Sequence, residues 1–310
     1  MISVIIPTFR PKYLREVLTA LRSQITNYPF EVIVVENPES TEAVQTLVHN
    51  YGFRYETSIL GANNARHHGI SVAQYGLIAL IDDDVIPNKH WVQQMVSLNE
   101  TNKAYSVFGG SLDLEYRATP PKWVTGPFEQ MLSRLRWDAQ YPRRLNEGEY
   151  VVSGNMFFRK ETYNAVNGLN LEAGYMGRDW KPNDEVEFVE KCKEIGPVFY
   201  APELKANHQI DETRLSLNFF RQRFYGQGWA DGKLYLRQHH RKPINDIYHD
   251  HIQPKLILAE TIVIYSVREK LCNEDLTREF IKNYLICKTD YMCAFQSAIL
   301  ECKLWEPILI

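Results

Sequence analysis

Cysteine is scarce in this chain, and the few cysteines form no recognisable pattern. Five occur among 310 residues, all of them in the second half, and no two are spaced as a Cys-x-x-Cys pair. An odd count without close spacing argues against a disulfide framework and against a zinc knuckle. We therefore expect a reduced, cytoplasmic protein, because disulfides are rare in that compartment.

Long hydrophobic runs and a leader segment are also absent. The best apolar stretch beyond the N-terminus, residues 256–267, is interrupted by Glu260 and is too short to span a bilayer. The first seven residues carry no basic segment and no cleavage site, so they do not predict a signal peptide. These absences argue against a membrane-spanning chain and leave open peripheral contact with the inner face of a membrane.

The chain has no strong charge of either sign, and it has no dinucleotide fingerprint. Its formal net charge is −3, so no broad basic field indicates a nucleic-acid partner. A Gly-x-Gly-x-x-Gly segment does not occur, which argues against a dinucleotide cofactor. Internal repeats are missing as well. A length of 310 residues suffices for one large α/β domain with an appendage.

The first third of the chain alternates short apolar strands with amphipathic helices. This alternation predicts an α/β protein whose central, mostly parallel sheet is flanked by helices. The predicted strands are residues 3–7, 31–35, 53–57 and 77–81, and the predicted helices are residues 11–24, 41–50 (capped by Ser40 or Thr41), 63–74 and 91–98.

Strands and helices continue in the rest of the chain, around one irregular segment. Residues 117–148 are rich in proline, glycine and arginine, and this composition predicts a functional loop or lid rather than core. The predicted strands are residues 105–114, 151–159, 198–200 and 204–209, and the predicted helices are residues 184–195, 255–270, 276–300 and a segment from 215 onward.

Three consecutive aspartates, Asp82, Asp83 and Asp84, follow the predicted strand at residues 77–81. Adjacent like charges repel one another, and a bound cation or metal–phosphate complex relieves that repulsion. A solvated acidic turn is the alternative interpretation. Open α/β sheets bind ligands at the carboxyl ends of their central strands, and this placement favours the cation site.

Polar and aromatic side chains also follow the first two predicted strands and open the third predicted helix. A hydroxyl, an aromatic ring and a guanidinium suit a nucleotide base and its phosphates. A carboxylate after the second strand suits a base or ribose, although it equally suits the entry of a helix. An arginine near a helix N-terminus suits a diphosphate. The residues concerned are Pro7, Thr8, Phe9, Arg10, Glu36, Asn37 and Arg66.

Taken in order, these segments resemble family 2 glycosyltransferases of the GT-A fold. Each segment alone is a weak signal, but their common order along about residues 1–230 is specific. The resembling segments are residues 3–8, 34–37, 64–69, 82–84, 153–159 with 166–169, 184–188, and His208 with Arg214 and residues 221–226.

The resemblance implies an inverting transfer of a sugar from a nucleoside-diphosphate sugar to an acceptor hydroxyl of a glycan, polysaccharide or glycolipid. It implies Mn²⁺ or Mg²⁺ as cofactor, with Asp84 as the first metal ligand and His208 as the second. Within the nucleotide-sugar site it places Asp83 at the ribose or a metal-bound water, while Asp82 braces the turn. Such ions typically use one or two protein carboxylates together with phosphate oxygens.

The family's catalytic base falls on Glu185, because the second acid of its Glu-Asp motif has that role. Here the order is reversed, Asp184 before Glu185, and Asp184 is the reserve candidate. A general base near the acceptor hydroxyl contributes roughly 10²–10⁴-fold in rate. The alternative is that both acids only favour the N-terminus of a helix.

Carried over position by position, the resemblance also suggests contacts to the donor and acceptor. Arg66 meets the pyrophosphate, and the residues after the first two strands meet the base and ribose of a donor, for which a UDP-sugar is the first expectation. On the acceptor side we expect Gly154 and Asn155, and we consider stacking on a sugar or ordinary packing for Trp123 and Trp137.

The resemblance predicts a nucleotide-sugar half (residues 1–115) and an acceptor half (116–230). It does not cover residues 231–310, whose pattern predicts a helical C-terminal extension. Apolar residues in the extension suit packing on the main domain or formation of a homo-oligomer. Its basic segment 235–242 suits an anionic headgroup or a solvated helix end. The alternative functions are a sugar-1-phosphate nucleotidyltransferase and a non-catalytic carbohydrate-binding protein of the same fold.

Overall fold

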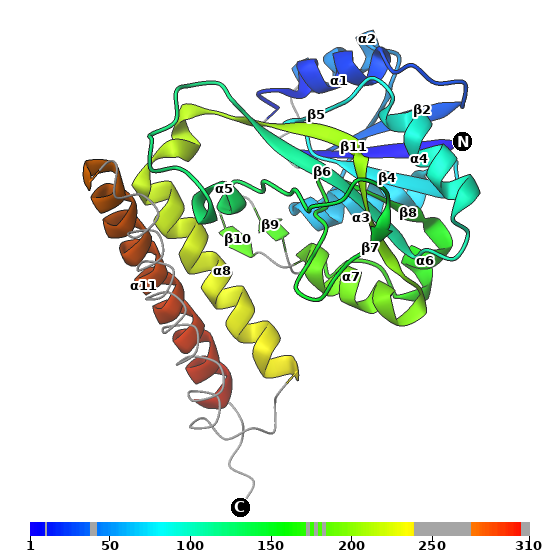
Figure 1. The fold of residues 1–310 in the computed structure, drawn as a ribbon. Helices are drawn as coiled ribbons and strands as arrows, with labels where there is room; N and C mark the ends of the chain where they lie inside the picture. The colour runs from blue at the N-terminus through cyan, green and yellow to red at the C-terminus, as the bar shows by residue number, and fades with distance from the viewer. Residues whose placement is uncertain are drawn as a thin grey trace, which may run out of the picture. The chain divides into compact units, whose positions relative to one another are not determined.

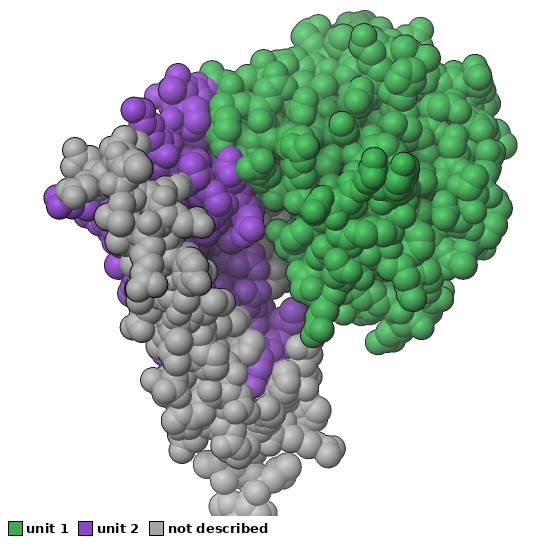
Figure 2. Space-filling view, viewed as in Figure 1, with its two compact units in different colours: residues 1–117, 133–210 green, residues 118–132, 211–310 purple. Residues whose placement is uncertain are grey.

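The computed structural model describes residues 1–9, 11–37, 42–171, 174–176, 179–181, 184–238 and 274–304. The chain divides into two compact units (Figure 2). Unit 1 comprises residues 1–117 and 133–210, and unit 2 comprises residues 118–132 and 211–310. One continuous helix, α8 (Leu217–Gln238), runs through the predicted boundary between residues 230 and 231, and the predicted division into domains stays a prediction.

Unit 1 is built on a nine-stranded sheet (Figure 1). Six strands (β1, β2, β3, β4, β6 and β11) run in one direction, and β5, β7 and β8 run antiparallel to their neighbours. The expected mostly parallel sheet is therefore confirmed. The strand order is β3 (Arg54–Thr57), β2 (Phe30–Glu36), β1 (Ile2–Thr8), β4 (Leu77–Ile81), β8 (Asn155–Arg159), β6 (Val107–Tyr116), β11 (Val198–Ile210), β5 (Val85–Pro87), and β7 (Arg143–Arg144) pairs with β11.

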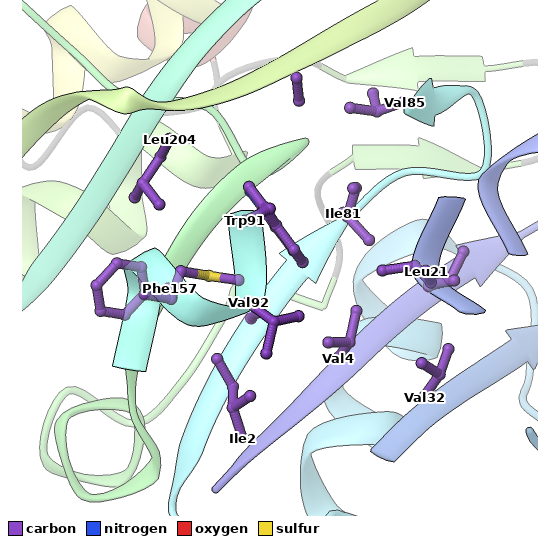
Figure 3. Packing of buried hydrophobic residues seen from close by; sticks show 14 of the residues in the cluster. Ile2, Val4, Leu21, Val32, Ile81, Val85, Trp91, Val92, Phe157 and Leu204 are labelled. Atoms are coloured by element: carbon purple, nitrogen blue, oxygen red, sulfur yellow. The ribbon is translucent and has the colours of Figure 1, made fainter. Parts of the chain in front are cut away.

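The central strands are buried on both faces because alternate side chains enter two separate hydrophobic clusters. Ile2, Val4 and Ile6 of β1 belong to one cluster, whereas Ile5 of the same strand belongs to the other. This follows from the two-residue period of a strand. Figure 3 shows the first cluster, in which Trp91 and Val92 pack over Val4 and Ile81. Fully burying one such aliphatic side chain stabilises the fold by roughly 1.5–3 kcal/mol.

Helices cover the two faces of this sheet, and their apolar stripes identify which face each one covers. Helix α1 contributes Leu14, Val17, Leu18 and Leu21 at helical spacing to the first cluster. Helices α2 and α4 contribute to the same cluster, and α3, α6 and α7 to the second. The bounds are α1 (Leu14–Arg22), α2 (Glu42–Asn50), α4 (Trp91–Thr101), α3 (Ala62–Val72), α6 (Lys160–Ala165) and α7 (Asp184–Ile195).

Several parts of unit 1 differ from the elements expected. The strands predicted at residues 198–200 and 204–209 are one strand, β11, whose register against β6 shifts between Ala201 and Lys205. Pro202 lies within this shift of register and does not end the strand. A small two-stranded sheet, β9 (Gly174–Met176) with β10 (Asp179–Lys181), was not expected. The predicted cap of α2, at Ser40 or Thr41, lies outside the described residues.

The irregular segment 117–148 is not simply a surface loop. It contains α5 (Pro127–Met131) and β7, and Phe128, Leu132 and Leu135 are at most 2% exposed. The expectation of a lid rather than core is therefore wrong for this part of the segment. Its proline and glycine residues suggested a loop, whereas the apolar residues between them pack as core.

Unit 2 contains a pair of long helices, α8 and α11 (Glu274–Leu304), preceded by a short 3₁₀ helix, η1 (Glu212–Leu215). The two helices approach closely at glycines of α8. A Cβ atom on Gly228 would lie 2.1 Å from the carbonyl oxygen of Tyr291, and one on Gly232 would lie 2.8 Å from the carbonyl oxygen of Phe295. The predicted helix at residues 255–270 lies outside the described residues. None of the described helices is both long enough and apolar enough to cross a membrane.

Candidate active site

The candidate site lies where parallel strands β1, β2 and β4 end side by side in unit 1. Thr8 and Glu36 are paired positions at the ends of β1 and β2, and Asp82 directly follows β4. The backbone N–H of Asn37 donates to the carbonyl of Thr8 at 2.9 Å, which keeps the two strand ends together. Predicted residues from separate sequence segments thus meet at the carboxyl edge of the sheet, where α/β proteins bind ligands.

The first aspartate of the acidic turn is held by an ion pair. Asp82 Oδ1 accepts a hydrogen bond from Arg66 Nη2 at 2.9 Å, and the Arg66 side chain is only 7% exposed. On its other side Asp82 lies against Gly154, where an added Cβ would stand 3.0 Å from Oδ2. Gly154 is therefore needed because a larger residue would displace this carboxylate. These contacts hold the Asp82 carboxylate in place, and its predicted role in the nucleotide-sugar site stays a prediction.

The second aspartate connects the turn to the end of β1. The hydroxyl of Thr8, a residue that is 2% exposed, donates a short hydrogen bond to Asp83 Oδ2. This bond joins two segments that the sequence separately predicted to contact the nucleotide. It also gives Asp83 a different partner from Asp82, so the like charges of the turn are directed apart.

The third aspartate lies beside His208 of β11. Asp84 Oδ2 and His208 Nε2 are 3.3 Å apart, and their side chains are 13% and 10% exposed. The backbone fixes this approach, because the N–H of Gln209 donates to the carbonyl of Asp84 at 2.8 Å and His208 pairs with Val85 of β5. The two predicted metal ligands are thus brought together from distant parts of the sequence.

This pair fits a divalent cation that takes its other ligands from a substrate. A carboxylate oxygen and a neutral imidazole nitrogen are both ligands for Mn²⁺, and such ions often rely on phosphate oxygens and water for the rest. Within the described part of the chain, no group of three His, Cys, Asp or Glu residues is arranged to hold a metal. Two protein ligands leave other coordination positions of such an ion to phosphate oxygens and water.

The carboxylate at the end of β2 is oriented by a tyrosine that the sequence did not reveal. Tyr55 donates its hydroxyl to Glu36 Oε2 at 2.7 Å, and Glu36 is 3% exposed. Strands β2 and β3 pair Glu36 with Thr57, so Tyr55, two residues earlier, is on the same face. Asn37 is also buried, and its side-chain oxygen has no hydrogen-bond partner among the described residues.

Arg66 is engaged within the protein rather than extended towards open solvent. Its Nη1 donates to Asn63 Oδ1 at 3.0 Å, and its Nη2 donates to Asp82. The predicted contact of Arg66 with the pyrophosphate stays a prediction, and the observed geometry gives the residue a bracing role. Of the other residues predicted around the first strand, Pro7 is buried, Phe9 is half-buried, and Arg10 lies outside the described residues.

Glu185 lies in the first turn of α7 and is half-buried. Burial raises the pKa of the Tyr150 phenol, and the negative charge of Glu185 raises it further. Glu185 therefore lies close enough to Tyr150 to influence its ionisation. Trp137 donates its Nε1–H to the Tyr150 carbonyl at 2.9 Å, and the two rings meet edge to face at 5.5 Å. Tyr150 and Trp137 thus form an aromatic group near the candidate base. The side chain of Asp184 lies outside the described residues.

Two residues predicted on the acceptor side, Asn155 and Trp123, have contacts within the protein. Asn155, which is 1% exposed, donates to the carbonyls of Ser111 and Leu204 at 2.8 Å and accepts from the Trp91 indole at 2.8 Å. Trp123 lies in unit 2, where it packs on Phe128 and Phe220 and is 6% exposed. Both side chains are buried and make packing and positioning contacts, and the predicted contacts with an acceptor stay predictions.

A protein family and several known proteins resemble this chain in sequence. A protein-family model described as "Glycosyl transferase family 2" matches residues 3–166. A chondroitin synthase of Pasteurella multocida is 24% identical over 220 residues, 60% of this chain and 22% of that protein. A hyaluronan synthase of the same species is 36% identical over 104 residues, 31% of this chain and 11% of that protein. The chain therefore spans only a minor part of these relatives' length.

A third relative is nearer in size, and solved structures resemble the fold. A glucosyl-dolichyl phosphate glucuronosyltransferase of Haloferax volcanii is 20% identical over 172 residues, 55% of this chain and 54% of that protein. The mannosyltransferase PcManGT from Pyrobaculum calidifontis, in complex with GDP-Man and Mn²⁺, aligns with a TM-score of 0.58 at 14% identity, over 99% of this chain and 87% of that one. TarS of S. aureus in complex with UDP-GlcNAc aligns with a TM-score of 0.51 at 12% identity, over 98% and 91%. The fold is thus of the GT-A type that the resemblance predicted.

Proposed function

Because the chain belongs to glycosyl transferase family 2, we propose that it transfers a sugar from a nucleoside-diphosphate sugar to an acceptor hydroxyl, with inversion and with a divalent metal. The observation that carries this proposal is the acidic turn. Each of its aspartates has a separate partner, and Asp84 lies 3.3 Å from His208. A solvated acidic turn would require none of these contacts.

In the proposed reaction the acceptor oxygen attacks the anomeric carbon of the donor sugar. The bond from that carbon to the diphosphate breaks, and the proton of the attacking hydroxyl passes to the Glu185 carboxylate. Asp84 and His208 would hold a Mn²⁺ or Mg²⁺ ion, which when bound stabilises the negative charge of the leaving diphosphate. Thr8, Asp83 and Glu36 would hold the nucleoside end, so that the anomeric carbon is presented to the acceptor.

For the substrates we propose a UDP-sugar and a growing polysaccharide or lipid-linked glycan. The named relatives include chondroitin and hyaluronan synthases and a dolichyl phosphate glucuronosyltransferase, all of which assemble such products by name. The solved neighbours hold either a uridine or a guanosine nucleotide, so the experiment must include both bases. A cytoplasmic location, with peripheral contact at the inner face of a membrane, belongs to the same proposal.

A donor panel tests the proposal directly. The protein is incubated with UDP-, GDP- and dTDP-sugars and Mn²⁺ or Mg²⁺, with chondroitin and hyaluronan oligosaccharides as acceptors, and nucleoside diphosphate and product are measured. We expect Asp84→Ala to abolish metal-dependent turnover and Glu185→Gln to lower transfer by roughly 10²-fold or more. Glu190→Gln is the matched control, because Glu190 is an exposed carboxylate on the same helix.

Three outcomes would contradict the proposal. Turnover that persists in Asp84→Ala excludes the metal assignment, and undiminished transfer in Glu185→Gln excludes the base assignment. Release of pyrophosphate from a nucleoside triphosphate and a sugar phosphate, without sugar transfer, would instead identify a nucleotidyltransferase.

A further inference from the structure

A series of hydrogen bonds connects the acidic turn to α7, the helix that carries Glu185. Beyond the ion pair of Asp82 with Arg66, Asn63 accepts from Arg66 Nη1 at 3.0 Å. The other end of the Asn63 amide, Nδ2, donates to the carbonyl of Asn170 at 2.8 Å. Asn170 in turn donates through its own Nδ2 to Glu187 Oε2 of α7 at 3.1 Å. This series of hydrogen bonds thus ends at Glu187, two residues after the candidate base.

The middle of this series of hydrogen bonds is buried, so its polar groups need partners within the protein. Asn63 is 0% exposed, and both ends of its amide are used, one by a guanidinium and one by a backbone carbonyl. A buried amide in this position has a preferred orientation, because reversing it would set donor against donor. Asn63 therefore fixes the position of Asn170 relative to the acidic turn.

Helical geometry explains what the last bond does for Glu185. Successive residues of an α-helix are rotated by about 100°, so side chains two positions apart point to nearly opposite sides. Glu187 faces Asn170, and Glu185 consequently faces away from it. The apolar contacts of α7 begin one residue later, at Phe188, so the hydrogen bond of Glu187 adds a directional contact in the first turn, before the packed part of the helix.

We propose that Asn170 and Glu187 are positioning residues that fix the rotation of α7 and thereby hold the Glu185 carboxylate at the acceptor. The inference rests on the proposed function, in which Glu185 is the base. Neither residue touches the substrates. Their effect is on the rate of the chemical step, because a general base displaced by about 1 Å loses much of its efficiency.

The test compares variants of Asn170 and Glu187, which are half-buried, because substitution of the fully buried Asn63 risks loss of folding. Asn170→Asp removes the donor and sets one carboxylate against another, and Glu187→Ala removes the acceptor. Glu187→Gln keeps an acceptor oxygen for Asn170. Lys191→Gln is the matched control, because Lys191 pairs with Glu187 Oε1 at 3.2 Å, whereas Asn170 donates to Oε2. Circular dichroism and thermal midpoints confirm that each variant is folded.

We expect Asn170→Asp and Glu187→Ala to lower kcat for transfer by about tenfold or more, with the donor KM changed less than about twofold. Glu187→Gln restores most of the rate, and Lys191→Gln retains it. In a Glu185→Gln background the same substitutions have no further effect, because the group they position is gone. The substrates are the donor and acceptor found with the panel described above.

The inference is overturned if Glu187→Ala and Asn170→Asp leave kcat unchanged, if they alter donor KM and kcat alike, or if their effects multiply with that of Glu185→Gln. Failure of the proposed function has a different signature. In that case Glu185→Gln by itself retains full transfer, whatever the Asn170 and Glu187 variants do.

Discussion

At the scale of single residues, the acidic turn is stable because its three carboxylates point to three different partners. Asp82 meets Arg66, Asp83 meets Thr8 and Asp84 meets His208. Three unpaired carboxylates in such proximity would repel one another, and the repulsion would raise the free energy of the folded state. The turn therefore combines a braced end, at Asp82, with an end suited to a cation, at Asp84.

Gly154 provides a residue-scale prediction. Gly154→Ala places a methyl group 3.0 Å from Asp82 Oδ2, so we expect the carboxylate to move, its ion pair with Arg66 to weaken and kcat/KM for the donor to fall by about tenfold. Steady-state kinetics measure the effect. Gly76→Ala is the matched control, because an added Cβ there meets nothing within 4 Å. Equal activity of the two variants would show that the position of Asp82 does not matter.

At the scale of elements, the segment before β8 is held in place by one ion-paired loop. Arg143 of β7 donates from Nη1 and Nη2 to Glu149 at 2.6 and 2.7 Å, and the backbone N–H of Asn146 donates to the same carboxylate at 2.7 Å. These bonds close the loop directly before Tyr150. The hydrogen bond from Arg143 is the main cause that lowers the pKa of Glu149 to about 2.

This shift predicts how the stability of the loop depends on pH. A carboxylate whose pKa is lower in the folded state than the unfolded value of 4.5 contributes stability above that value. The contribution is lost as the pH falls from about 4.5 to about 2, by at most about 1.4 kcal/mol per pH unit. Unfolding by urea at pH 6, 4.5 and 3 measures it, and Glu149→Gln is expected to show a weaker decline.

Glu190→Gln is the control for that measurement, because it also removes one negative charge but from an exposed position of α7. The loop assignment fails if the free energy of unfolding of Glu149→Gln declines between pH 4.5 and 3 as steeply as that of the unaltered protein.

At the scale of the whole molecule, the proposed binding site draws on strands from both ends of the sequence of unit 1. Thr8, Glu36 and Asp84 come from the first hundred residues, and His208 comes from β11, close to the end of that unit. A ligand that bridges these segments binds only the folded unit, and it therefore stabilises the protein against unfolding.

Ligand binding gives the whole-molecule prediction. UDP and Mn²⁺ together, at about 100 times the dissociation constant, are expected to raise the free energy of unfolding by about 2.7 kcal/mol and the Tm by several degrees. Because the ion and the diphosphate share ligands, either one alone should give a smaller shift. Scanning calorimetry measures the Tm, with Asp84→Ala as the comparison. A full shift from UDP without metal, or an unchanged shift in Asp84→Ala, would contradict the shared site.

Much of the fold could be predicted from periodicity alone. The two-residue period of β1 and the helical spacing of apolar residues in α1 are local, and they depend on the geometry of the backbone. The predicted bounds of β4 and α7 agree with the structure for the same reason. The segment from 117 to 148 was misjudged because its prolines and glycines are a local signal for loops, whereas burial of Phe128 depends on distant residues.

The order of the motifs, the α/β class and the position of three aspartates at the end of a buried strand could all be inferred from the sequence. The side-chain contacts, in contrast, depend on how the chain folds in three dimensions. Folding brought His208 to Asp84, set Arg66 on Asp82, oriented Glu36 through Tyr55 and connected Asn63 to Glu187 through Asn170. Patterns of neighbouring residues specify strands and helices, but these contacts join residues far apart in the chain. Strand register and side-chain packing alone determine their geometry.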